Sequence, residues 1–173
     1  KDQRFVGKQT ILGSGYSMGP PRFQEQLRVA GVDIAMKEAC RINSIYRDTN
    51  WNIVNLWAKA GYALTEMFVG NDVTLGPNGL LKAIPSAEST LLKNCGFTLP
   101  SGLQLRYDGM EVEEGERGPQ FTYKMRNGRA KIYGGKGVEN ICQALARAII
   151  TEQMLLINKK YRPVLTVHDS VAA

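Results

Sequence analysis

The sequence predicts an α+β fold, with helices in the first half of the chain and antiparallel strands in the second. Three observations support this. Apolar residues recur at helical steps over four successive stretches, residues 3–15, 22–29, 34–47 and 51–68. An Asn127-Gly128 pair lies between two runs rich in aromatic and β-branched residues, which is typical of a hairpin. A second long helical pattern covers residues 138–158.

The composition is that of a globular chain with a basic excess. The 173 residues are 43% hydrophobic and carry a net charge of +6, which favours a polyanionic partner. Cys40, Cys95 and Cys142 lack metal-ligand spacing, so we expect reduced thiols and no zinc site. No apolar run reaches the length of a membrane span and no signal peptide is visible, so we expect an intracellular protein with no membrane partner.

The first helical stretch carries four informative residues at a spacing of four: Arg4, Lys8, Leu12 and Tyr16. On a helix this spacing places them on one slowly drifting face. A guanidinium and an ammonium one turn apart can bind two phosphates, and the apolar and aromatic residues beyond them can meet a sugar and a base. The alternative is a solvated helix face, with Leu12 and Tyr16 in the core.

The pattern Arg4-x3-Lys8-x3-Leu12-Gly-x2-Tyr16 resembles motif B of DNA polymerase family A, the DNA polymerase I-like enzymes, in their phage-type branch. The resemblance implies that Arg4 and Lys8 hold the incoming triphosphate. Leu12 would lie against the sugar and base of that nucleotide, and Tyr16 would close on the templating base. Two residues depart from the family pattern: Leu12 replaces Phe or Tyr, and Ser17 replaces Gly.

The middle of the chain has weaker signals. Residues 80–84 and 89–95 are expected to form short helices, and residues 98–107 alternate as a strand does. Residues 111–119 read as a solvated surface insertion, because consecutive carboxylates usually lie on a polar loop. We therefore set aside a metal site formed by the acidic cluster of this run: Glu111, Glu113, Glu114 and Glu116.

Two strands, residues 121–125 and 130–133, flank the hairpin turn and lead into Tyr133-Gly-Gly-Lys-Gly137. This segment lacks the spacing of a phosphate-binding P-loop, so an ATPase is excluded. It resembles the segment of phage-type family A enzymes that precedes the palm helix. The resemblance makes three residues candidates for contact with primer–template DNA, with a structural role as the alternative: Lys136, Gln143 and Arg147.

Near the end of the chain, an apolar strand is broken by His168-Asp169-Ser170. Ordinary turn chemistry at a hairpin tip explains this break, yet an Asp that ends a mostly buried strand must be solvated, paired or metal-bound. The string Thr-Val-His-Asp resembles motif C of family A. The resemblance implies that Asp169 binds the catalytic metal and that His168 contacts the primer end. Ser170 stands where the family has Glu.

Together these resemblances imply a partial right-hand polymerase: residues 1–68 as fingers, 69–120 as an irregular connection with an insertion, and 121–173 as part of the palm. The activity implied is primer extension with deoxynucleoside triphosphates through two Mg²⁺ ions. Replication accessory proteins are further candidate partners, and the location implied is the cytoplasm of a bacterial host if the gene belongs to a phage. No match to the motif A Asp precedes Arg4, and the sequence opens without Met. We therefore expect an internal fragment that is inactive alone.

Two other interpretations stay open. A single-subunit phage-type RNA polymerase has a related Arg/Lys helix and a motif C that often reads His-Asp-Ser, as residues 168–170 do here. A basic nucleic-acid-binding module without catalysis also fits the composition, but it leaves Asp169 unexplained.

Overall fold

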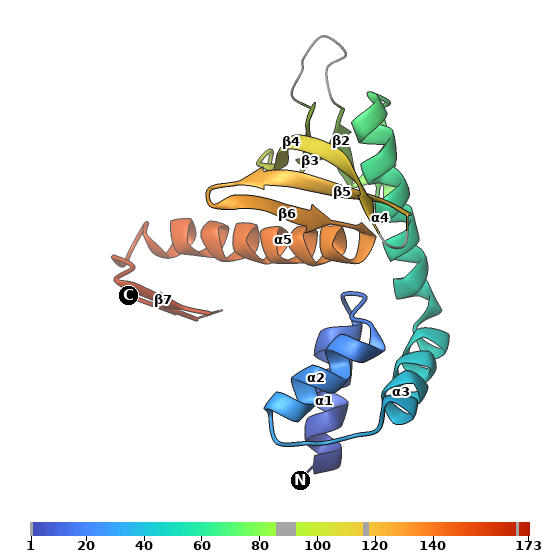
Figure 1. Cartoon of the computed structure of the whole chain (residues 1–173). Helices are drawn as coiled ribbons and strands as arrows, with labels where there is room; N and C mark the ends of the chain where they lie inside the picture. Colours follow the sequence, from blue (N-terminus) through green and yellow to red (C-terminus); the bar gives the residue numbers. More distant parts are fainter. Residues whose placement is uncertain (1, 86–92, 116–117, 169) are drawn as a thin grey trace.

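A computed structural model describes residues 2–85, 93–115, 118–168 and 170–173 (Figure 1). Its first half is helical, and the four helices predicted there are confirmed with end shifts of a few residues. They are α1 (Asp2–Ser14), α2 (Pro20–Val29), α3 (Met36–Thr49) and α4 (Trp51–Val69). No helix within the described ranges combines the length and apolarity that a membrane span requires. Helices α1, α2 and α3 pack around a small core of fully buried Phe23, Leu27 and Ala39.

Helix α4 links this small bundle to the rest of the molecule. The indole N–H of Trp57 donates a hydrogen bond of 3.1 Å to the carbonyl oxygen of Gly15, just beyond α1. Asn50 lies between α3 and α4, but its side-chain amide donates to the carbonyl of Tyr46 at 2.9 Å. Asn50 therefore forms no side-chain cap on α4.

The second half contains a six-stranded antiparallel sheet in which each strand pairs with the one before it. The strands are β1 (Thr74–Leu75), β2 (Leu81–Ile84), β3 (Lys93–Thr98), β4 (Gln104–Gly115), β5 (Gly118–Met125) and β6 (Gly128–Ile132). The predicted β5–β6 hairpin is confirmed, since Met125 pairs with Gly128 across a two-residue loop. The mixed α and β content agrees with the predicted α+β class.

Three local predictions in this region differ from the structure. Residues 81–84 form β2 rather than a short helix, because Leu81 is buried, Lys82 is exposed and both neighbouring strands pair with β2. Residues 93–95 belong to β3, and residues 89–92 lie outside the described ranges. The strand expected over residues 98–107 is interrupted. Residue 98 ends β3 and residues 104–107 begin β4, but residues 99–103 between them form a turn in which Gly102 adopts a left-handed φ of 82°.

The acidic run is also not a loop. Glu111, Glu113 and Glu114 lie on β4 and pair in register with β5, while Glu116 is outside the described residues. Arg129 of β6 explains how strand β4 tolerates two of these carboxylates. Its guanidinium lies 3.2 Å from the Glu111 carboxylate and 3.7 Å from that of Glu113, and it donates to the Thr122 hydroxyl at 2.9 Å. The side chains of Glu111 and Glu113 stay 58% and 49% exposed, so the expectation of a solvated surface segment is confirmed, and only its loop conformation is wrong.

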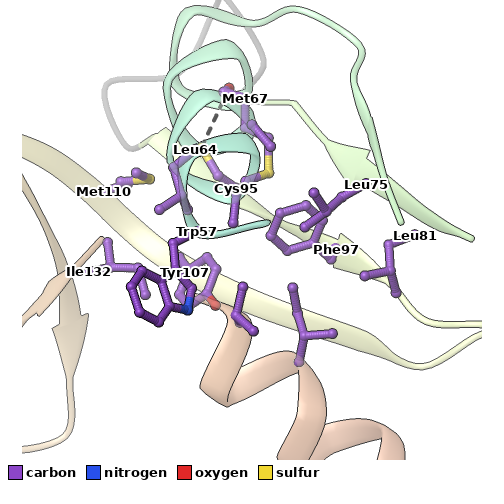
Figure 2. Packing of buried hydrophobic residues seen from close by; sticks show 14 of the residues in the cluster. Trp57, Leu64, Met67, Leu75, Leu81, Cys95, Phe97, Tyr107, Met110 and Ile132 are labelled. Atoms are coloured by element: carbon purple, nitrogen blue, oxygen red, sulfur yellow. Dashed lines mark hydrogen bonds between the residues drawn. The ribbon is translucent and has the colours of Figure 1, made fainter. Parts of the chain in front are cut away.

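The main core lies between α4, one face of the sheet and α5 (Gly134–Ile157) (Figure 1). Figure 2 shows Trp57, Leu64 and Met67 of α4 directed toward Phe97 and Tyr107 of the sheet. The Cys95 thiol, buried among them, donates to the Met67 carbonyl at 3.6 Å. After α5 the chain forms a separate two-stranded hairpin, β7 (Leu165–Val167) and β8 (Ser170–Ala172).

Helix α5 begins four residues before its predicted start, because Gly134 and Gly135 belong to its first turn. A Cβ on Gly134 would overlap the Trp57 carbonyl oxygen and lie 2.8 Å from the Gly61 nitrogen. A Cβ on Gly135 would overlap the Ser17 side chain and lie 2.9 Å from the Tyr16 carbonyl oxygen. The two glycines therefore let the start of α5 touch α4 and the turn after α1 at the same point.

We expect Gly134→Ala to lower the free energy of unfolding by about 3 kcal/mol, because the new methyl group meets backbone atoms that cannot rotate away. Gly137→Ala is the matched control: it lies in the same turn of α5, and a Cβ there meets nothing within 4 Å. It should stabilise the chain by about 0.5–1 kcal/mol through helix propensity. Urea unfolding of both variants checks this, and equal effects would contradict the close approach.

Burial raises the pKa of Tyr107 from 10.0 to about 12, although a hydrogen bond of 3.3 Å from the Asn140 side chain opposes the shift. Between these values the unfolded chain has lost the phenolic proton and the folded chain keeps it. Stability therefore falls as the pH rises from 10 to 12, by about 2 kcal/mol from this group. Unfolding measured across that range should show a shallower decline in Tyr107→Phe, and a decline as steep as that of the unmodified chain would contradict this contribution of the buried hydroxyl.

Candidate functional site

Helix α1 presents the predicted face to solvent. Arg4 and Lys8 are exposed, and Leu12 is 53% exposed, so the alternative that places Leu12 in the core is wrong. Within the described part of the chain, neither Arg4 nor Lys8 forms an ion pair with a carboxylate. Two uncompensated cations one turn apart beside an exposed apolar residue form a surface that can bind a polyphosphate.

Tyr16 lies just beyond α1, in a turn closed by the Met18 N–H, which donates to the Gly13 carbonyl at 3.3 Å. It is half-buried and not on the helix itself. Ser17 in this turn has a φ of 68°, in the left-handed region that favours glycine. Glycine in the motif B pattern at this position suits that backbone, and Ser17 occupies it at a cost of about 1–2 kcal/mol.

A hollow of about 330 Å³ opens at this end of α1. Leu12 and Tyr16 line it together with Arg22 of α2, Tyr133 at the junction of β6 and α5, and Glu139 of α5. Sequence reasoning missed Arg22 and Tyr133. Arg22 is separated from Tyr16 by the break between α1 and α2, and Tyr133 is more than a hundred residues further along the chain, so only the tertiary fold brings them to the hollow. The one local signal for Tyr133 is that it directly precedes the two closely packed glycines.

The candidate DNA-contacting side chains on α5 differ in whether they are already paired with a carboxylate. Lys136 forms an ion pair of 2.8 Å with Glu139, and the Gln143 amide donates to the same carboxylate at 3.2 Å. Arg147 is exposed and has no carboxylate partner among the described residues. Ala144 and Leu145 pack against the core, so Gln143 and Arg147 project from the part of the helix that the sheet leaves uncovered.

The hairpin expected at residues 163–173 is confirmed. Val167 pairs with Ser170, so the turn lies between these two residues. His168 is exposed and has a φ of 54°, and Asp169 lies outside the described residues. Elsewhere, the described ranges contain no cluster of three or more His, Cys, Asp or Glu side chains arranged to hold a metal ion.

In Figure 1 the six-stranded sheet lies on one side of α5, while α1 and the β7–β8 hairpin lie on the other. Helix α1 and the β7–β8 hairpin therefore share the side of α5 that the sheet does not cover. The structure brings Leu12 and Tyr16 together at one hollow, with Arg4 and Lys8 further along the same helix.

The chain is 32% identical, over 177 aligned residues, to a protein named DNA polymerase from Bacillus phage SP02. The alignment covers 96% of this chain and 26% of the phage protein, so the chain spans about a quarter of the length of that relative. No protein-family profile matches the sequence, and no solved structure matches it. The similarity supports a relation between this chain and part of a DNA polymerase.

Proposed function

We propose that residues 1–173 are part of a phage-type, family A DNA-directed DNA polymerase that adds deoxynucleotides to a primer 3′ end. The observation that carries the proposal is the exposed face of α1, which presents Arg4, Lys8 and Leu12 in the order that a nucleotide needs. The similarity to a phage protein named DNA polymerase, over almost the whole chain, supports it independently. On this proposal residues 1–68 act as fingers and residues 121–173 as part of the palm.

In this proposal α1 binds the incoming nucleotide. Arg4 contacts one phosphate as a planar fork, and Lys8 contacts the next as a point charge. Neither cation is neutralised by a described carboxylate, so both are available to offset charge as the phosphates transfer. Leu12 lies against the sugar and base of the nucleotide, and Tyr16, at the edge of the hollow, meets the templating base.

Asp169 would serve as one carboxylate ligand of two Mg²⁺ ions, and His168 would contact the primer end. The second carboxylate lies outside residues 1–173. The metal ions, when bound, supply a lowered pKa for the primer 3′-hydroxyl and neutralise the leaving pyrophosphate. Ser170, at the start of β8, contributes no charge where the family pattern has Glu.

Primer–template DNA would lie along the uncovered part of α5. Arg147 is its strongest candidate contact, because it is exposed and has no described carboxylate partner. Gln143 can exchange its bond to Glu139 for a bond to DNA, whereas Lys136 mainly holds Glu139. The proposal includes replication accessory proteins as further partners. It places the protein in the cytoplasm of a phage-infected bacterium.

The test is primer extension by the complete gene product with Mg²⁺, offering deoxy- and ribonucleotides separately. Asp169→Ala should abolish extension. Arg4→Ala and Lys8→Ala should each raise the KM for deoxynucleotides roughly 10- to 100-fold, since each removes a charged contact to phosphate. Lys37→Ala, an exposed cation on α3, is the matched control and should leave the KM unchanged.

A ribonucleotide preference would identify a single-subunit RNA polymerase instead. Extension that survives Asp169→Ala would refute the assignment of the hairpin tip. Residues 1–173 alone should incorporate no nucleotide, because one metal-binding carboxylate is missing from them.

The side chain of Leu12 has neither a ring nor a hydroxyl to replace the 3′-hydroxyl that a dideoxynucleotide lacks. We therefore expect the polymerase to discriminate against dideoxynucleotides, and Leu12→Tyr to relax that discrimination. The ratio of kcat/KM for deoxy- over dideoxynucleotides measures it. Leu12→Met should keep the ratio of the unmodified enzyme, and an unchanged ratio in Leu12→Tyr would remove this role from Leu12.

A further inference from the structure

We propose that Tyr133 positions the unpaired template nucleotide by stacking on its base, in the hollow at the end of α1. This inference rests on the function proposed above. It assigns a role to Tyr133, the first residue of the Tyr-Gly-Gly-Lys segment, for which the resemblance implies none. The hollow of about 330 Å³ is lined from several elements, and Tyr133 is the lining residue contributed by the junction of β6 and α5.

The backbone at Tyr133 is fixed while its side chain is available. Gly134 is in contact with α4 and Gly135 with the turn that carries Tyr16, so the backbone directly after Tyr133 has little freedom. The Tyr133 side chain is 45% exposed and does not belong to the buried core. It also lines a second hollow of about 690 Å³, between α4 and β4–β6. An exposed ring on a fixed backbone loses little freedom when it binds a planar ligand.

The charges around the hollow favour a nucleotide over a neutral aromatic ligand. Glu139 is compensated, because Lys136 lies 2.8 Å from its carboxylate and Gln143 donates to it. Arg22 lines the hollow without an ion-pair partner in the described part of the chain. The local excess is therefore positive beside two tyrosines, which suits a base that carries a phosphate.

The position of the hollow relative to Arg4 and Lys8 favours the template strand, rather than the incoming nucleotide, as the ligand of Tyr133. Arg4 and Leu12 are eight residues apart, which is about 12 Å along a helix. The triphosphate is assigned to Arg4 and Lys8, so the incoming nucleotide extends from there toward Leu12. The hollow is lined by Leu12, Tyr16 and Tyr133 but not by Arg4 or Lys8, so it lies at the end of α1 away from the cations assigned to the triphosphate. The nucleotide that faces the incoming base from that side is the unpaired template nucleotide.

The test uses the complete gene product on a primer–template whose first unpaired template base is the photoreactive 5-iodouracil, with the crosslinked residue mapped by mass spectrometry. We expect the crosslink at Tyr133. Tyr133→Phe should retain it, and Tyr133→Leu should lose it. In steady state, Tyr133→Leu should lower kcat/KM for the correct nucleotide about tenfold, and Tyr133→Phe should stay within about twofold.

Tyr62→Leu is the matched control, since Tyr62 is 62% exposed on α4 and lines neither hollow. It should leave both crosslinking and kcat/KM unchanged. A crosslink that maps only to other residues, or an unchanged kcat/KM in Tyr133→Leu, would overturn the role of Tyr133 while primer extension stands. Failure of the unmodified protein to extend any primer would instead overturn the proposed function. The crosslink map of the unmodified protein decides the question even if Tyr133→Leu folds poorly.

Discussion

The structure depends on the contact that two adjacent glycines allow at the start of α5. Gly134 brings the helix against the backbone of α4 at Trp57 and Gly61, and Gly135 brings it against Tyr16 and Ser17. Trp57 adds the hydrogen bond to Gly15 that holds the same turn from the other side. A side chain larger than hydrogen at either glycine would separate the helical bundle from the sheet and displace the hollow at the end of α1.

The helices could be predicted because their signal is local. The apolar stripes of α2, α3, α4 and α5 recur over ten residues or more, and the Asn-Gly turn of the β5–β6 hairpin needs only its own backbone. The rest of the sheet could not be read in this way. β1 and β2 are too short to show alternation, and Glu111 and Glu113 of β4 are paired with Arg129 from β6. That compensation exists only once three strands have paired.

In the candidate site, too, the features set by local sequence could be predicted and those set by tertiary packing could not. The spacing of Arg4, Lys8 and Leu12 predicts their common exposed face, because the positions lie within three helical turns. The hairpin tip at His168 was also expected from its sequence. Arg22 and Tyr133 could not be found, since the hollow that unites them with Tyr16 is made by tertiary packing. The ion pair between Lys136 and Glu139 likewise requires the helix to begin earlier than its periodicity indicates.

The order of the strands has a consequence for how the chain folds as it is synthesised. Because every strand of the sheet pairs with its immediate predecessor, the sheet can grow by one local hairpin at a time, with little entropy lost in closing each loop. Helix α4 is made before any of these strands, yet its partner α5 is made after all of them. Until α5 emerges, Trp57, Phe97 and their neighbours lack part of their cover. The nascent chain thus holds an exposed apolar face that a chaperone can recognise, and docking of α5 ends that exposure.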